Sequence, residues 1–254
     1  MMKRRYIPIV LLTSLYASIA SAQEWKTIRV AVASDYMPFS WVSSSGELQG
    51  FDVEVARELC QRLEAKCEFN AKAWNNLIPS LLEDQYDVVL SGISITDSRK
   101  EKLDFSVPYI NIPSRFISKK THSIDFSDLT QYKIGVRAGA ANDKYVTSLQ
   151  GDGAHIVRFD SFSTGYFQLS NDDIDLIFDD AALLYDTVLS QRGGENYHFV
   201  GEPVDDVKWF GEGAGIGVNK SNKELTLKIN KELTEFIKTD KYNQLFARYL
   251  KVTN

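Results

Sequence analysis

Segment 91–99 follows residues 86–90, whose apolar pattern predicts a buried strand, and it carries groups suited to binding a carboxylate. They are the backbone N–H groups of a turn, the hydroxyls of Ser91 and Ser94, and the Arg99 guanidinium, which can grip a carboxylate bidentately. Ligands of open α/β sheets bind beyond the carboxyl ends of strands, where this segment lies. The alternative is an ordinary turn that caps the next helix.

Two adjacent carboxylates, Asp179 and Asp180, follow a second apolar run, residues 174–178. In this place, at the end of a predicted strand, they can hold an ammonium group. The alternative is that an aspartate caps the helix predicted over residues 181–189.

Four aromatic residues form a third group: Tyr36, Phe39, Trp41 and Trp74. Aromatic faces can hold a flat or cationic side chain. The alternative is packing in the core.

The remaining motifs indicate no cofactor, metal or catalytic residue. Glycines 211, 213, 215 and 217 alternate with other residues, whereas a dinucleotide-binding turn needs G-x-G-x-x-G between a strand and a helix. We expect them to allow close backbone packing at a crossover strand. The three histidines are scattered, and G-x-S-x-G, H-E-x-x-H and P-loop motifs do not occur.

Strand-like and helix-like patterns alternate along the chain. Strands are predicted over residues 28–32, 68–69, 86–90, 133–136, 155–159 and 174–178. Helices are predicted from Asp52, over residues 75–82 and 181–189, and over residues 225–249 with a break near 239–240. This alternation predicts an α/β protein with mostly parallel sheets in two lobes. Segments 109–114 and 207–213 are the expected crossovers, after which the tail helices return to the first lobe.

The composition is that of an ordinary globular protein, with 44% hydrophobic and 25% charged residues among 254. With a net charge of −5, the sequence gives no sign of a basic surface that would bind nucleic acid.

The N-terminus has the features of a secretory signal peptide. Residues 3–5 are basic, residues 6–20 are mostly apolar, and Ala20-Ser21-Ala22 resembles a cleavage site. The alternative, a membrane anchor, would need a longer apolar run.

Cys60 and Cys67 lie seven residues apart, just past a predicted helical stretch. Because an exported protein meets an oxidising compartment, we expect them to form a local disulfide. The alternative is two buried free thiols.

Several segments together resemble the family 3 extracellular solute-binding proteins, which serve polar amino-acid ABC importers. These segments are residues 36–40, 50–60, 77–81, 94–99, 210–217 and 242–249. The chain is most similar to the lysine/arginine/ornithine- and histidine-binding branch, which also carries a short-range disulfide matching Cys60 and Cys67.

The resemblance implies a two-lobed periplasmic-binding-protein fold of type II, with a mostly parallel sheet in each lobe and two crossover hinges. The expected division is a signal peptide at 1–22, lobe 1 at 23–110 and 211–254, and lobe 2 at 111–210. We expect a periplasmic monomer that contacts a membrane ABC permease transiently and binds no nucleic acid.

By the same resemblance, Arg99 binds the α-carboxylate of an amino acid, helped by Ser94 and the backbone around Gly92. Asp180 matches the residue that binds the α-ammonium.

The ligand's side chain is expected to stack on Trp74, with Tyr36 on its other side. Ser91 matches a residue that hydrogen-bonds the ligand.

The chain departs from this branch at positions that bear on the ligand. Ala33 replaces an acid that contacts basic side chains, although Asp35 is close by, and Gly92 replaces a serine. The turn 139–141 lacks hydroxyls, so at Ala141 only the backbone N–H remains to hold the carboxylate.

Arg137 stands where the branch has an apolar contact. A cation there repels a basic ligand unless Asp179 pairs with it.

The predicted function is capture of a polar L-amino acid, basic by the branch resembled, through closure of two lobes, followed by delivery to an ABC permease. One alternative is a cyclohexadienyl dehydratase-like enzyme on the same scaffold, with Asp179 or Asp35 as general acid. Another is a free-standing ligand-binding partner of a membrane sensor.

Overall fold

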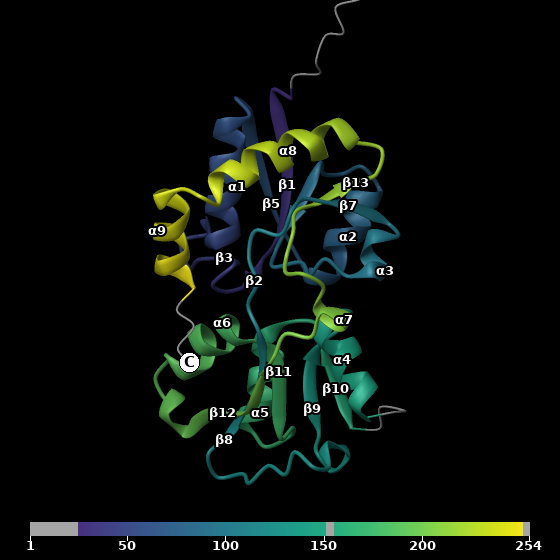
Figure 1. The fold of residues 1–254 in the computed structure, drawn as a ribbon. Coiled ribbons are helices and arrows are strands. Elements are labelled where there is room, and N and C mark those ends of the chain that lie inside the picture. The colour runs from purple at the N-terminus through teal and green to yellow at the C-terminus, as the bar shows by residue number, and fades with distance from the viewer. Residues whose placement is uncertain (1–24, 151–154, 251–254) are drawn as a thin grey trace, which may run out of the picture.

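The computed structural model describes residues 25–150 and 155–250, which form two lobes with a five-stranded sheet in each (Figure 1). The predicted signal peptide, residues 1–22, lies outside the described residues. Helices flank both sheets, as the alternating patterns predicted. Within the described ranges, no helix is long and apolar enough to cross a membrane.

The sheet of the first lobe has the strand order β5-β1-β6-β13-β7. Its strands are β1 (Thr27–Ala33), β5 (Lys66–Lys72), β6 (Val88–Leu90), β7 (Leu103–Phe105) and β13 (Gly217–Asn219). Strand β1 runs parallel to β5 and β6, whereas β13 is antiparallel to both of its neighbours. Residues 30–33 of β1 are buried, as expected for a parallel strand covered on both faces. A small antiparallel sheet follows β1: β2 (Asp35–Tyr36), β3 (Ser40–Val42) and β4 (Leu48–Gln49).

The tail of the chain returns to the first lobe, as predicted. The helices of this lobe are α1 (Phe51–Arg62), α2 (Trp74–Leu82), α3 (Asp97–Lys100), α8 (Lys223–Phe236) and α9 (Asp240–Tyr249). Both α8 and α9 pack against α1 (Figure 1). The predicted break between them is confirmed: the Thr239 hydroxyl caps α9 by accepting a hydrogen bond from the Tyr242 N–H at 3.2 Å.

The sheet of the second lobe has the order β10-β9-β11-β8-β12. Its strands are β8 (Ser114–Lys119), β9 (Ile134–Arg137), β10 (Ile156–Phe159), β11 (Leu176–Asp180) and β12 (Tyr197–Val204). Strands β10, β9 and β11 are parallel, and β8 and β12 are antiparallel. The α-helices of this lobe are α4 (Ala141–Gln150), α5 (Phe162–Ser170), α6 (Ala181–Leu184) and α7 (Val207–Phe210), and there are 3₁₀ turns at Leu129–Gln131 and Gly194–Asn196.

The predicted helix over residues 181–189 changes its winding halfway. Ala181–Leu184 is α-helical, but Tyr185–Leu189 is a π-helix. The Thr187 hydroxyl donates to the Leu183 carbonyl, and the Ser190 N–H reaches back five residues to the Tyr185 carbonyl at 2.8 Å. The Ser190 bond is of the i to i−5 type that defines a π-helix, which residue periodicity alone does not reveal.

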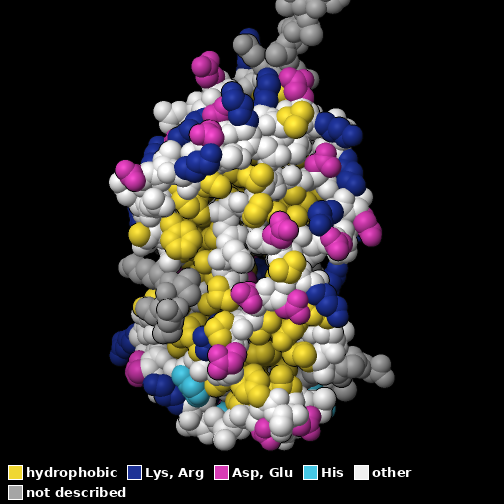
Figure 2. Space-filling view, in the orientation of Figure 1, with side chains coloured by type: hydrophobic (Ala, Val, Ile, Leu, Met, Phe, Trp, Pro, Cys, Tyr) yellow, Lys and Arg dark blue, Asp and Glu magenta, His cyan; other side chains and the backbone are white. Residues whose placement is uncertain are grey.

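Two crossover segments join the lobes, one between β7 and β8 and one between β12 and β13 (Figure 1). They contact each other, because Ala214 forms antiparallel bridges with both Ile110 and Ser94. A Cβ on Gly213 would lie 2.5 Å from the Ile110 carbonyl oxygen, so this close approach needs glycine. The prediction that the glycine run serves backbone packing is therefore confirmed. Viewed from the same side, apolar side chains gather in both lobes (Figure 2).

Cys60 in α1 and Cys67 in β5 form a disulfide, as predicted. It ties the helix to the edge strand of the first sheet. The lobe boundaries at residues 110 and 210 stay a prediction.

Candidate functional site

The charged and aromatic groups singled out in the sequence meet where the two lobes face each other. Those of the first lobe follow β1, β5 and β6, and those of the second lobe end or follow β9 and β11. Parallel strands present their carboxyl ends at one edge of a sheet, so each lobe offers one such edge to the junction.

Arg99, on α3, lies beside two other predicted site residues. Its Nη1 donates to the Ser94 carbonyl oxygen at 3.0 Å, and its guanidinium is 5.7 Å from the centre of the Trp74 ring. Burial lowers the pKa of Arg99 to about 10, although Tyr36 and Asp180 nearby oppose this shift. Arg99 therefore stays a cation at neutral pH, next to the turn that was predicted to bind a carboxylate.

A buried carboxyl group fixes that turn from behind. Asp52 accepts hydrogen bonds from the Gly92 N–H at 2.8 Å and from the Tyr109 hydroxyl at 2.7 Å. Burial raises the pKa of Asp52 to about 7, and these two bonds oppose the shift. Gly92 has φ +56°, and a Cβ there would lie 3.2 Å from the Tyr36 ring, so the turn needs glycine.

Ser91 is buried and connects three parts of the first lobe. Its Oγ accepts from the Ala33 N–H at 2.6 Å and lies 3.0 Å from the Ser40 Oγ. The hydroxyl thus supports the ends of β1 and β3, and its predicted bond to a ligand stays a prediction.

Asp180 reaches from the second lobe to the first. Its Oδ2 accepts a hydrogen bond from the Tyr36 hydroxyl at 2.6 Å. Its Oδ1 accepts from the Ser114 hydroxyl at 3.3 Å, which in turn accepts from the Asn142 side chain at 2.9 Å. Burial, reinforced by neighbouring Asp179, raises the pKa of Asp180 to about 7.

Asp179 is more deeply buried, with 1% of its surface exposed. Its Oδ1 accepts from the Asp180 N–H at 2.8 Å and from the Tyr36 hydroxyl at 3.3 Å. Its Oδ2 is buried and has no hydrogen-bond partner within the described part of the chain. Burial raises the pKa of Asp179 to about 6, and the nearby charge of Arg137 opposes this shift.

Arg137, at the end of β9, crosses to the first lobe. Its Nη1 lies 3.2 Å from Asp35 Oδ1, and its Nη2 donates to the Asp35 carbonyl at 3.4 Å. The guanidinium lies 4.9 Å from the centre of the Tyr36 ring and 6.0 Å from that of Trp74. Tyr36 and Trp74 are themselves 5.8 Å apart, in tilted orientation.

The turn that leads into α4 lies against the first lobe. A Cβ on Gly139 would be 3.7 Å from the Asn75 side-chain oxygen, and the Gly139 N–H donates to Asp143 at 3.1 Å. Ala141 begins α4 and is buried. Its predicted role, contact with a carboxylate through the backbone, stays a prediction.

Further polar contacts hold the lobes together. The Asn75 amide donates to Asp160 at 2.8 Å, and the Lys144 ammonium donates to the Ser98 hydroxyl at 2.7 Å. The Phe162 N–H donates to Asp35 Oδ2 at 3.3 Å. The two lobes are therefore closed on each other.

Little space remains in the closed junction. A cavity of about 20 Å³, lined by Gly92, Ser94 and Asp180 among others, has room for about one water molecule. Another, of about 160 Å³, lies beside Trp74 and Arg99. The side chains of the two lobes thus fill most of the site themselves.

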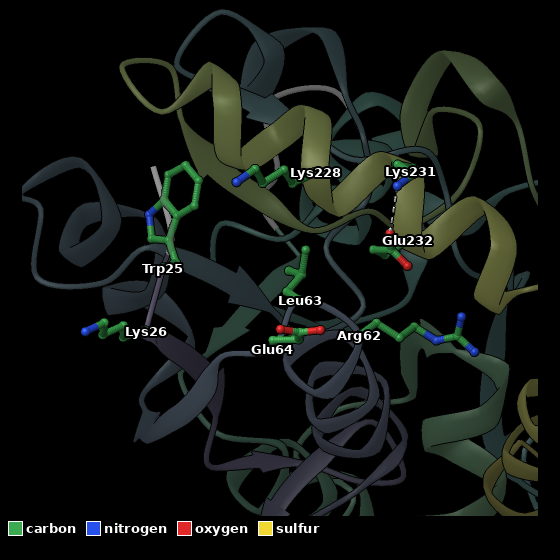
Figure 3. Close-up of a pocket in the computed structure, with 8 residues that line it drawn as sticks. All are labelled: Trp25, Lys26, Arg62, Leu63, Glu64, Lys228, Lys231 and Glu232. Carbon is green, nitrogen blue, oxygen red and sulfur yellow. Dashed lines mark ion pairs between the residues drawn. The ribbon is translucent and has the colours of Figure 1, made fainter. Parts of the chain in front are cut away.

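Larger cavities contain none of the predicted ligand-binding residues. One of about 360 Å³ lies at the edge of the junction and is lined from both lobes, by Asp35 and Trp41 and by Phe162 and Tyr166 among others. A second, of about 310 Å³, lies between the end of α1 and α8 and is lined by Trp25, Leu63 and Lys228 among others (Figure 3). A third, of about 700 Å³, lies beside the crossover segments.

Sequence reasoning missed three residues of the site: Asp52, Ser114 and Asn142. Asp52 was interpreted as the start of a helix; α1 begins one residue earlier, at Phe51, and the side chain of Asp52 is buried behind Gly92. Ser114 and Asn142 are uncharged residues on different elements, so no spacing signal relates them to Asp180.

Comparison with known proteins gives matches over most of the chain. The sequence model of the bacterial extracellular solute-binding proteins, family 3, matches residues 28–252. The L-arginine-binding protein of Pseudomonas aeruginosa is 34% identical over 247 residues, which cover 95% of each chain. The lysine/arginine/ornithine-binding periplasmic protein of Escherichia coli is 30% identical over 98% of this chain and 97% of that protein.

Solved structures agree with these sequence matches. A periplasmic binding protein of Salmonella typhimurium, described as having high arginine specificity, superposes with a TM-score of 0.82. It is 27% identical to this chain, and the match covers 89% of this chain and all of the other.

Proposed function

This chain belongs to the bacterial extracellular solute-binding proteins of family 3, as its motifs predicted, and we propose that it captures a polar L-amino acid for import. The two lobes close on the ligand, and the closed, monomeric complex then delivers it to a membrane ABC permease. No covalent step is required. The predicted signal peptide, the disulfide and the periplasmic relatives support action in the periplasm.

One observation carries this proposal: a cation of the first lobe and a carboxyl group of the second lie near each other on either side of Ser94, close enough for the charge of Asp180 to act on Arg99. Arg99 lies beside the Ser94 turn in the first lobe, and Asp180 lines the cavity next to Ser94 from the second lobe. An α-carboxylate on Arg99 and an α-ammonium on Asp180 match this arrangement. Since each lobe holds one end of the ligand, the ligand binds the closed state more tightly than the open state. Binding therefore shifts the protein toward the closed state.

The charges of the site favour a basic side chain on that amino acid. The charged groups around Tyr36 and Trp74 are two guanidinium groups, Arg99 and Arg137, and three carboxyl groups, Asp35, Asp179 and Asp180. A zwitterionic ligand adds no net charge, so the carboxylates remain in excess by one when all three are ionised. A cationic side chain neutralises that excess. The relatives named above, an arginine-binding and a lysine/arginine/ornithine-binding protein, support the same class.

A thermal-shift panel tests the proposal. The mature protein is unfolded and refolded to remove carried-over ligand, and then heated with L-arginine, L-lysine, L-ornithine, L-histidine, L-glutamine and L-glutamate. A ligand at about 100 times its Kd stabilises by about 2.7 kcal/mol, which raises Tm by roughly 5–10 °C in a protein of this size. We expect this rise with basic amino acids. No rise with any amino acid refutes the proposal.

Asp179 supports a second candidate, a dehydratase, because a buried cleft acid with a raised pKa can act as general acid. Prephenate has no ammonium group that could pair with Asp180. The presence of Asp180 therefore favours an amino acid as the ligand. Incubation with prephenate and with arogenate, followed by absorbance of the aromatic product, decides between them. We expect no product.

A further inference from the structure

The guanidinium of Arg137 packs against the rings of Tyr36 and Trp74 in the other lobe, a pair that we call the aromatic slot. It lies 4.9 Å from the centre of the Tyr36 ring and 6.0 Å from that of Trp74, and only 1% of the residue is exposed. These two rings are the ones expected to stack on the side chain of a bound amino acid. Arg137 therefore sits where a ligand's cationic side chain would lie.

The same side chain links the two lobes directly. Arg137 contacts both the carboxylate and the carbonyl of Asp35, at 3.2 and 3.4 Å. Since Arg137 ends β9 of the second lobe and Asp35 begins β2 of the first, both contacts cross the junction. This ion pair is almost fully withdrawn from water on the arginine side, so it is screened less than a surface pair.

A second acceptor stands beside Arg137 within its own lobe. Strands β9 and β11 pair Ile134 with Leu176 and Gly135 with Ile177. Continuing this parallel register by two residues places Arg137 next to Asp179.

Even so, the described residues include no ion pair between these two neighbours. Arg137 Nε and Asp179 Oδ2 are both buried, and neither has a hydrogen-bond partner there. A buried polar group without a hydrogen-bond partner costs free energy. An ion pair between Arg137 and Asp179 would satisfy both groups, but it is not formed in this closed structure.

We propose that Arg137 is a specificity-determining residue that acts as an internal competitor of cationic ligand side chains. Its guanidinium packs against the Tyr36 and Trp74 rings and links the lobes through Asp35 as a latch. A basic side chain enters the slot by displacing this guanidinium, which then pairs with Asp179. The inference rests on the proposed function and assigns the side-chain end of the same site.

Two consequences follow from displacement. Long cationic ligands bind more weakly than the slot itself allows, because part of their binding free energy is used to move Arg137. The ligand-free protein is also more closed than it would be without the latch, since Arg137 supplies the contact that a ligand would otherwise make.

Arg137→Leu tests both consequences, because leucine keeps an apolar contact but cannot reach Asp35 with a charge. Calorimetric titration with L-arginine is expected to give a Kd at least tenfold lower than that of the wild type. Small-angle X-ray scattering of the ligand-free variant is expected to give a larger radius of gyration. Arg192→Leu, which removes the same charge from an exposed position, is expected to change neither.

Arg137→Leu leaves Asp179 buried without a neighbouring cation, so Arg137→Leu/Asp179→Asn carries the test if the single variant does not fold. The proposal is overturned if the folded variant binds L-arginine as weakly as the wild type or more weakly, or if its ligand-free radius of gyration is unchanged. If neither protein binds any amino acid, the proposed function fails, and the scattering alone decides whether the latch exists.

Discussion

The hydroxyl of Tyr36 in the first lobe donates a 2.6 Å hydrogen bond to Asp180 Oδ2 in the second lobe. The carboxyl group proposed to hold a ligand's ammonium thus already has a donor from the opposite lobe. Together with Arg137 on Asp35, this bond makes the closed form self-complementary. A ligand whose ammonium binds Asp180 therefore competes with the Tyr36 hydroxyl for that carboxyl group.

Asp180→Asn keeps the shape of the side chain and removes its charge. Without the carboxylate, a buried ammonium has no counter-ion, and loss of one partner of a buried pair costs about 3–5 kcal/mol. We expect the affinity for L-arginine to fall at least a hundredfold, measured by calorimetric titration. Asp173→Asn, at an exposed position shortly before β11, is the matched control and is expected to bind normally. Binding by Asp180→Asn within threefold of the wild type contradicts the assignment.

Binding is expected to release a proton at mildly acidic pH. Burial and Asp179 raise the pKa of Asp180 to about 7, so at pH 6 the group is mostly protonated in the free protein. It must ionise to pair with an ammonium, and therefore affinity is lower at pH 6 than at pH 8. Titrations at pH 6 in two buffers of different ionisation enthalpy measure the released proton. Proton uptake, or no exchange at pH 6, is the contradicting result.

Asp52 is expected to make the protein less stable as the pH rises. Its pKa is about 7 in the folded protein, against about 3.9 for an unfolded aspartate, so the folded state holds the proton more tightly. This contribution is fully present below about pH 4 and is lost as the pH rises through 7. The unfolding free energy, measured with urea at several pH values between 5 and 8, should therefore fall less steeply with pH in Asp52→Asn than in the wild type. The difference in slope corresponds to at most one proton. An unchanged slope shows that Asp52 is ionised throughout.

The Cys60–Cys67 disulfide is expected to stabilise the first lobe without affecting the ligand site. Closing so short a loop contributes about 2–3 kcal/mol in the chain-entropy model. The double variant Cys60→Ala/Cys67→Ala should melt about 5–10 °C lower and still bind L-arginine with unchanged affinity. A similar loss of Tm in the wild type on reduction is the control. If the variant loses affinity instead, the disulfide positions the site.

Local patterns in the sequence predicted most of the scaffold and part of the site. The break between α8 and α9 could be located because Thr239 is a strong helix cap. Arg99 could be related to Ser94 because it lies only five positions further along the chain. In such cases the residues that interact are also neighbours in the chain.

Contacts across the junction could not be predicted in the same way. Arg137 and Asp35 are 102 residues apart, and their pairing depends on how the two lobes close. The sequence showed that a cation near the side-chain end conflicts with a basic ligand. It did not show that the cation itself fills the aromatic slot, since no periodicity encodes the relative placement of two lobes.

Calorimetric titration with L-arginine and two of its analogues tests the central claim most directly. Agmatine lacks the α-carboxylate that Arg99 is proposed to hold, and L-argininic acid has a hydroxyl in place of the α-ammonium assigned to Asp180. The account predicts that L-arginine binds and that each analogue binds at least a hundredfold more weakly. Equal binding of agmatine and L-arginine, or no binding of L-arginine, would contradict it.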